Sequence, residues 1–173
     1  MAGFGAFGKM PAVGDFFRVS APPGFVSAWD PWLQRALLAG QAALGAEWDG
    51  HYMTAPIWRF ALAPGLAGRS KVMGVLMPSV DRVGRRFPLT LMAALDTPGP
   101  APLDHFREAA LFARLEEVAL CALGDAATRD GLETDLAAIP APEMRATAPL
   151  RRAGGCLVLT QSGQDTLPGD LAA

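Results

Sequence analysis

The chain has 173 residues, of which 51% are hydrophobic and 18% are charged, and this composition predicts one globular domain spanning residues 1–173. It excludes an intrinsically disordered chain and a coiled coil. Lys and Arg together number 15 against 17 Asp and Glu, so the formal net charge is -2. A surface that neutralises many phosphates carries a basic excess, so we expect no nucleic-acid partner.

The sequence also predicts the compartment. The longest apolar runs, such as residues 89–95, reach about a third of the ~20 residues that a membrane-spanning helix needs, so no membrane span is expected. Residues 1–5 show no basic segment and no leucine-rich stretch, so no secretory leader is expected. Cys121 and Cys156 are expected as free thiols. These features together predict a cytoplasmic protein.

The N-terminal segment predicts extended structure. Short apolar stretches at residues 6–7 and 16–19 are separated by Pro11 and Gly14, which is typical of a two-strand hairpin or of one strand with a broad turn. Lys9 and Asp15 are expected to pair or to cap within this hairpin. Both lie in the polar stretch between the two strands.

A long helix is predicted next. From Phe25 to Leu44 apolar residues recur with helical spacing, and Gly45 is typical of the position after a helix. Pro31 leaves two alternatives for the start. Either the regular helix begins with Asp30 as its N-cap and Pro31 at the first position, or the first turn is kinked.

Three strands are predicted in the middle of the chain. Residues 55–63, 72–78 and 87–95 are short, apolar and bounded by Pro or Gly. The seven or eight residues between them are too few for helical crossovers, so the strands are predicted to form an antiparallel meander. Pro78 and Pro88 belong at strand ends or on an edge, because neither can donate a ladder hydrogen bond.

The C-terminal part predicts two helices and a last strand. Asp104 is the expected N-cap of a helix that ends at Gly124 and carries an apolar stripe of Leu111, Leu115, Val118 and Ala122. A shorter helix is predicted at 129–138 and a buried strand at 155–160. Helices grouped around an antiparallel sheet define an α+β domain.

Two glycine motifs near the N-terminus are not expected to bind nucleotide. Residues 3–8 fit G-x-G-x-x-G, and residues 3–9 fit the first seven positions of a Walker A loop. No residues precede Gly3 to form the required strand, and Met10 stands where magnesium needs a hydroxyl group. We therefore expect no cofactor at this segment.

Metal binding and nucleophilic catalysis have little support in the sequence. The soft ligands have no partner two to five residues away, and they are His51, His105, Cys121 and Cys156. Neither His lies in a segment with a nucleophile elbow such as G-x-S-x-G. No metal, no cofactor and no catalytic residue are expected.

The segment 78–88 is a charged turn between two apolar strands, and it is too long for a minimal hairpin. Asp81 can accept hydrogen bonds from nearby amides or pair with Arg82 or Arg85, and Gly84 permits a positive φ. We expect Asp81 and at least one of these arginines to hold the turn by intramolecular hydrogen bonds. Two interpretations remain open: a self-satisfied structural turn, or a recognition loop that offers guanidinium groups to a carboxylate or phosphate.

Four blocks of the sequence carry a resemblance to a known family: FGKMPAVGDF at 7–16, WDPWLQ at 29–34, APIWRF at 55–60 and GVLMPSVDRVGR at 74–85, followed by FPL at 87–89. In this order the blocks resemble the TagF (ImpM) family of type VI secretion accessory proteins of Gram-negative bacteria. In the first block the motif residues are Gly8, Lys9, Pro11, Gly14 and Asp15. The end of the fourth block, continued to residue 86, is a loop that either binds a partner or has a structural role. Its residues are Ser79, Asp81, Arg82, Gly84, Arg85 and Arg86.

The resemblance implies a fold and a function. It implies a longin- or profilin-like domain, with a five-stranded antiparallel sheet and helices on both faces. It further implies a cytoplasmic protein that is not an enzyme and that restrains the secretion apparatus after translation. The implied partner is a protein, such as the forkhead-associated scaffold of that apparatus. The alternative is a small phosphate-binding or hydrolytic enzyme with a site near Asp81 and Arg85. A deep pocket where Asp81, Arg85 and Asp15 converge would favour this alternative, and a flat surface would disfavour it.

Overall fold

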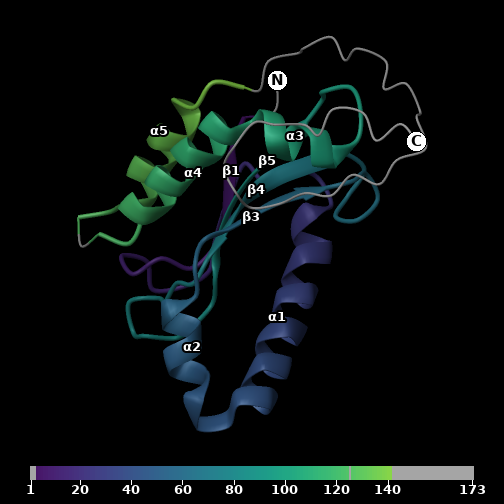
Figure 1. Ribbon diagram of the computed structural model, residues 1–173. Helices are drawn as coiled ribbons and strands as arrows, with labels where there is room; N and C mark the ends of the chain where they lie inside the picture. The colour runs from purple at the N-terminus through teal and green to yellow at the C-terminus, as the bar shows by residue number, and fades with distance from the viewer. Residues whose placement is uncertain (1–2, 125, 142–173) are drawn as a thin grey trace.

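The computed structural model describes residues 3–124 and 126–141, and its centre is a five-stranded antiparallel sheet with the order β2-β1-β5-β4-β3 (Figure 1). Helices cover both faces of this sheet. The predicted α+β class, with an antiparallel sheet between helices, is confirmed. The strand predicted at 155–160 lies outside the described residues. Among the described residues, no helix combines the length and the hydropathy that a membrane crossing requires.

The predicted N-terminal hairpin is present. It consists of β1 (Gly5–Gly8) and β2 (Phe17–Val19), and the other edge of β1 pairs with β5. Gly8 has φ +135°, and a Cβ at this position would lie 2.0 Å from the carbonyl oxygen of Pro88. Residues 5–8 of the G-x-G-x-x-G match therefore form strand β1, where glycine permits close packing.

The predicted meander is also confirmed. β3 (Trp58–Leu62), β4 (Lys71–Met77) and β5 (Leu89–Leu95) pair in sequence, each antiparallel to the next. Pro78 follows the end of β4 and Pro88 precedes β5, at the strand ends where proline was expected.

Alternation along these strands separates two apolar layers. One layer lies between the sheet and the first helix and includes Phe7, Phe25, Trp29, Leu33, Val72 and Met92. The other layer lies between the opposite face and the C-terminal helices and includes Met73, Val75, Leu91, Phe112, Leu115 and Leu132. The sheet is therefore buried on both faces, which explains why β4 and β5 are apolar at nearly every position.

The first helix, α1 (Phe25–Leu44), begins six residues before the position that one of the alternatives proposed. Gly24 is its N-cap with φ +79°, and Pro31 lies inside the helix, so the start at Asp30 is wrong. Pro31 has no amide to donate to the Ser27 carbonyl, and both Pro31 and Ser27 are exposed. Only the N-terminal half of α1 is buried against the sheet, through Phe25, Trp29 and Leu33.

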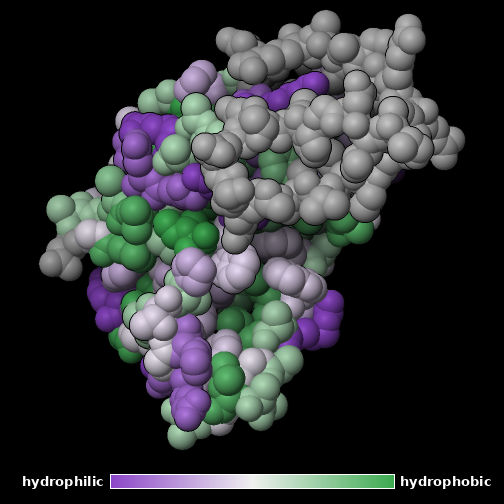
Figure 2. Space-filling view, viewed as in Figure 1, coloured by the Kyte–Doolittle hydropathy of each residue, from purple (hydrophilic) through white to green (hydrophobic). Residues whose placement is uncertain are grey.

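The rest of α1 projects beyond the sheet and forms an arm with a helix that the sequence analysis missed (Figure 1). This helix is α2 (Trp48–Thr54), joined to α1 by a short 3₁₀ turn at Gly45–Glu47. Trp48 packs against α1 at Gly40, where a Cβ would lie 2.2 Å from the indole ring. On the end of the arm, hydrophilic residues lie beside apolar ones (Figure 2).

The predicted helix starting at Asp104 is two helices. α3 (Ala101–Arg107) starts after Pro100, and α4 (Ala109–Cys121) follows after a break at Glu108. Asp104 is not an N-cap: it lies inside α3, is buried, and its Oδ2 is 2.5 Å from Nζ of Lys71 on β4. The last predicted helix is confirmed as α5 (Arg129–Ala137), whose N-cap Thr128 accepts from the Gly131 amide.

Removing one member of the buried Lys71–Asp104 pair should strongly destabilise the fold. Both side chains are less than a tenth exposed, and Lys71 Nζ also donates to Thr97 Oγ1 and to the Gly99 carbonyl. We expect Asp104→Leu to lower the free energy of unfolding by about 3–5 kcal/mol, because it leaves a buried ammonium without its counter-charge. Urea unfolding followed by circular dichroism measures this. The double variant Lys71→Met/Asp104→Leu should lose less than the single one, and an equal or larger loss would contradict this account.

Candidate functional site

The charged turn 79–86 is attached to α2 at its base. The Tyr52 hydroxyl donates to the Ser79 carbonyl at 2.8 Å and accepts from the Ser79 amide at 3.1 Å. The Phe87 amide donates to the same carbonyl at 3.1 Å, which closes the turn. Burial raises the pKa of Tyr52 to about 12, against the effects of its Ser79 hydrogen bond and of the nearby Arg86 charge, so the hydroxyl keeps its proton at neutral pH.

The carboxylate of Asp81 organises the interior of the turn. Oδ1 accepts from the amides of Val83 at 3.1 Å and Arg85 at 2.9 Å. Oδ2 accepts from Arg85 Nε at 2.6 Å and lies 3.0 Å from Lys9 Nζ. Gly84 has φ +81°, which brings the chain back toward the carboxylate. The expected hydrogen bonding between Asp81 and an arginine is confirmed, and the arginine is Arg85.

The second cation comes from the N-terminal segment. Lys9 follows β1 directly, is 5% exposed, and places its ammonium 4.7 Å from the centre of the Phe16 ring. The expectation that Lys9 pairs within the hairpin is therefore wrong, because its partner Asp81 lies in the distant turn. Asp15 does act locally, since its Oδ1 accepts from the Phe16 amide at 2.8 Å.

Backbone contacts also join the segment 10–15 to the turn. Arg85 Nη2 donates to the Gly14 carbonyl at 2.8 Å, and the Arg82 amide donates to the Val13 carbonyl at 3.3 Å. The guanidinium of Arg82 lies over Gly14, where a Cβ would be 3.0 Å from Nη2. Two of the sequence blocks, 7–16 and 74–85, therefore form one substructure, which we call the Asp81 clamp: Lys9, Gly14, Asp81 and Arg85.

The pKa of the Asp81 carboxyl lies well below its usual range. Burial opposes its ionisation, and this effect is outweighed by hydrogen bonds from the Arg85 amide, the Lys9 ammonium, the Arg85 guanidinium and the Val83 amide. The clamp is therefore an internal ionic cluster at neutral pH. Each oxygen of the Asp81 carboxylate already has two donors, so the carboxylate fixes the turn and is not available to bind another molecule.

The outer surface of the turn carries the residues that are free to contact another molecule. Val83 of the turn is 71% exposed, and Phe16 of the neighbouring N-terminal segment is 48% exposed. Arg82 is exposed and forms no side-chain ion pair within the described part of the chain. Arg86 is engaged by Asp49 of α2 at 2.7 Å, in an exposed pair.

The remaining residues singled out from the sequence have structural positions. Ser79 is 2% exposed, Gly8 ends β1, and Pro11 lies in the turn that the Val13 amide closes on the Met10 carbonyl. Sequence reasoning missed Tyr52, whose hydroxyl group forms two hydrogen bonds with the backbone of Ser79 at the start of the turn. A signal was present, because Tyr52 is the single tyrosine of the chain and stands four residues from Trp48 at helical spacing.

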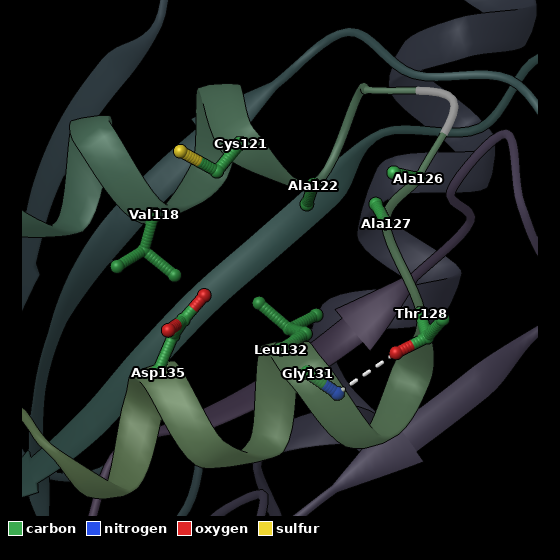
Figure 3. A pocket seen from close by; sticks show the side chains of 9 residues that line it. All are labelled: Val118, Cys121, Ala122, Ala126, Ala127, Thr128, Gly131, Leu132 and Asp135. Atoms are coloured by element: carbon green, nitrogen blue, oxygen red, sulfur yellow. Dashed lines mark hydrogen bonds between the residues drawn. The ribbon is translucent and has the colours of Figure 1, made fainter.

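Surface hollows lie away from the clamp. A hollow of about 170 Å³ between α4 and α5 is bordered by Val118, Cys121, Leu132 and Asp135 (Figure 3). A more open one of about 460 Å³ lies beside the start of β4. Neither is lined by any residue of the turn 79–86. Within residues 3–124 and 126–141, no group of three or more His, Cys, Asp and Glu is placed to hold a metal ion.

Comparison with known proteins gives the family. The TagF N-terminal domain family, described as type VI secretion system-associated, matches residues 5–139, which include the whole clamp. The chain therefore belongs to the TagF family. A crystal structure of PA0076 from Pseudomonas aeruginosa PAO1 is similar, with 42% sequence identity and a TM-score of 0.74. The match covers 81% of this chain and 64% of that one, so this chain spans less than two thirds of the length of that relative. No curated protein matched.

The Asp81 clamp should make the stability of this TagF-family domain depend on pH. The folded-state pKa of Asp81 is lowered, so its stabilisation is complete above the unfolded pKa of about 3.9 and is lost as the pH falls further. We expect the midpoint of urea unfolding to fall between about pH 5 and pH 2, and to fall less steeply in Asp81→Asn.

Asp130→Asn is the matched control, since Asp130 is an exposed carboxylate in the first turn of α5. This variant should keep the pH slope of the wild type. An unchanged slope in Asp81→Asn would show that the clamp is not formed in solution.

Proposed function

We propose that this TagF-family protein is a cytoplasmic regulator that restrains a type VI secretion system after translation by binding a protein partner. The forkhead-associated scaffold of the system is the partner that the family resemblance implies. Membership of a family described as type VI secretion system-associated supports the setting. The protein acts by occupying its partner, without turnover.

The observation that carries the proposal is the contrast between the two sides of the turn 79–86. Its inner side is held by a buried carboxylate with two cations and two amides, and by Tyr52. Its outer side presents Arg82 and Val83. A turn that is fixed before binding loses little conformational entropy in the complex, which favours recognition. Arginine is also among the residues that most often anchor interfaces.

The contacts of the three arginines in the turn support Arg82 as the residue to test. Arg85 holds Asp81 and the Gly14 carbonyl, so its substitution disturbs the turn itself. Arg86 pairs with Asp49. Arg82 keeps its guanidinium at the surface, so it is the residue whose charge can be reversed without loss of the clamp.

An enzymatic function has no specific observation in its favour. A deep pocket at which Asp81, Arg85 and Asp15 converge would favour that alternative. Asp81 and Arg85 are instead bonded to each other, and Asp15 bonds to the neighbouring amide. The three groups that this alternative invokes are thereby engaged within the chain.

The test compares Arg82→Glu with wild type in binding and in secretion. Purified protein is titrated by calorimetry against the purified scaffold, and secretion output is measured against protein level in a strain that carries the system. We expect saturation at a fixed stoichiometric ratio, and a loss of affinity of about thirtyfold in Arg82→Glu, the effect of one interface anchor of about 2 kcal/mol.

Arg69→Glu serves as the control, because Arg69 is another exposed arginine without an ion pair among the described residues. It should bind and repress like wild type, with circular dichroism confirming that both variants fold. Full silencing at substoichiometric protein would contradict the occupancy mechanism. Normal repression by folded Arg82→Glu would show that another surface binds.

A further inference from the structure

The two edges of the sheet differ in how they are protected. β2 forms one edge, has three residues, and exposes Arg18 at its centre. Short length and an exposed charge are features by which natural proteins prevent pairing of an edge strand with another chain. β3 forms the other edge, has five residues, and exposes Trp58 to 60%. Within the described residues, no strand pairs with the outer side of β3.

The charge on β3 does not protect this edge. Arg59 Nε and Nη2 donate to the two carboxylate oxygens of Glu116 at 2.6 and 2.8 Å, and the guanidinium lies 5.5 Å from the Phe112 ring centre. The hydrogen bond from Arg59 lowers the pKa of the Glu116 carboxyl, so Arg59 and Glu116 both stay charged. The guanidinium is thus fixed over α4, on the far face of the sheet, which is the face opposite α1. Glu116 neutralises its charge there, so the edge of β3 carries no net charge.

The near face of the same edge is aromatic. Trp58 and Phe60 stand on the face that α1 covers, because they pair with Leu76 and Gly74 of β4. The ring centre of Trp29 lies 4.8 Å from that of Phe60 and 4.7 Å from that of Trp32. Trp32 is 45% exposed, so apolar surface continues from the strand onto α1. An exposed apolar surface beside an unpaired strand is typical of an interaction site.

We propose that β3 pairs with β3 of a second copy of this chain, antiparallel and with Phe60 at the two-fold axis, so that two sheets become one. In such a pair, directly opposite residues project to the same face of the sheet. A two-fold axis perpendicular to the sheet therefore passes through a residue position. With the axis at Phe60, all five residues of β3 pair, and both α1 helices lie on the same side.

The sequence of β3 is self-complementary in this register. Trp58 lies opposite Leu62 of the second copy, so a large side chain meets a smaller one on the aromatic face. On the far face Arg59 lies opposite Ala61, so the two guanidinium groups do not face each other. A shift of the axis to Arg59 would place like charges directly opposite, which is unfavourable, and a shift to Ala61 would leave Trp58 outside the paired region.

The helices extend the interface beyond the strands. A stable dimer buries about 800 Å² on each partner, which is more than five strand residues supply. Trp32 on each α1 lies next to the shared sheet, and its exposed ring would be covered by the second copy. This dimer uses no residue of the turn 79–86, so it is independent of the regulatory role proposed above.

Cysteine cross-linking tests both the dimer and its register. The native thiols are first removed with Cys121→Ser and Cys156→Ser. Phe60→Cys should then form a disulfide-linked dimer under mild oxidation, because opposite Cα atoms in an antiparallel pair are about 4.5–5.5 Å apart, within disulfide range. Trp58→Cys and Leu62→Cys should each fail to cross-link alone, since their own copies lie about 13 Å apart along the strand. A mixture of these two variants should cross-link.

Sedimentation velocity tests the unmodified interface. We expect a dimer in wild type at about 100 µM, and a rise of about tenfold or more in the dissociation constant of the dimer in Trp58→Lys, which places an ammonium on the paired edge. Leu120→Lys is the control, since Leu120 is 56% exposed on α4 and away from the edge. Both sites are exposed, so both variants should fold.

Three results would overturn the proposal. They are a wild-type monomer at that concentration, a dimer that Trp58→Lys leaves unchanged, and equal cross-linking at positions 58 and 60. A monomer would mean that another molecule or another part of the chain covers the β3 edge.

Discussion

The buried carboxylate of Asp81 is the point on which the candidate site depends. A carboxylate removed from water is stable only if hydrogen bonds and counter-charges replace its hydration. Here the donors come from two separate parts of the chain, Lys9 after the first strand and the turn itself. The charge therefore joins the N-terminal segment to the turn. Because Tyr52 holds Ser79, α2 is joined to the same structure.

Burial separates the ionic contacts of the molecule into two kinds. Lys9–Asp81 and Lys71–Asp104 are shielded from water, so loss of one member leaves an uncompensated charge inside the protein. Pairs such as Arg114–Glu117 and Arg129–Glu133 are exposed, screened by salt, and contribute little. The two buried pairs lie near the two ends of β4. Lys71 is the first residue of the strand, and Asp81 lies in the turn that follows its last residue.

The two surfaces proposed for interaction lie on different elements and have different chemistry. The turn offers a guanidinium group and a small apolar side chain on a fixed backbone. The β3 edge offers unpaired backbone groups beside tryptophan rings. A dimer formed through β3 would present two copies of the turn, which increases the effective concentration of the second turn once the first is bound.

The sequence by itself determined the sheet strands, α5 and the α+β class, because apolar periodicity and proline or glycine boundaries are local signals. It also identified the turn 79–86 as unusual and predicted that Asp81 holds it. It did not predict α2, which has one buried residue and little apolar periodicity. It also predicted the wrong roles for Asp104, as a helix N-cap, and for Lys9, within the N-terminal hairpin, because each residue suits that role locally. Only the tertiary structure decided their partners, because the pairs Lys9–Asp81 and Lys71–Asp104 join residues that are far apart in the sequence. A local sequence pattern does not indicate which buried charges will come into contact.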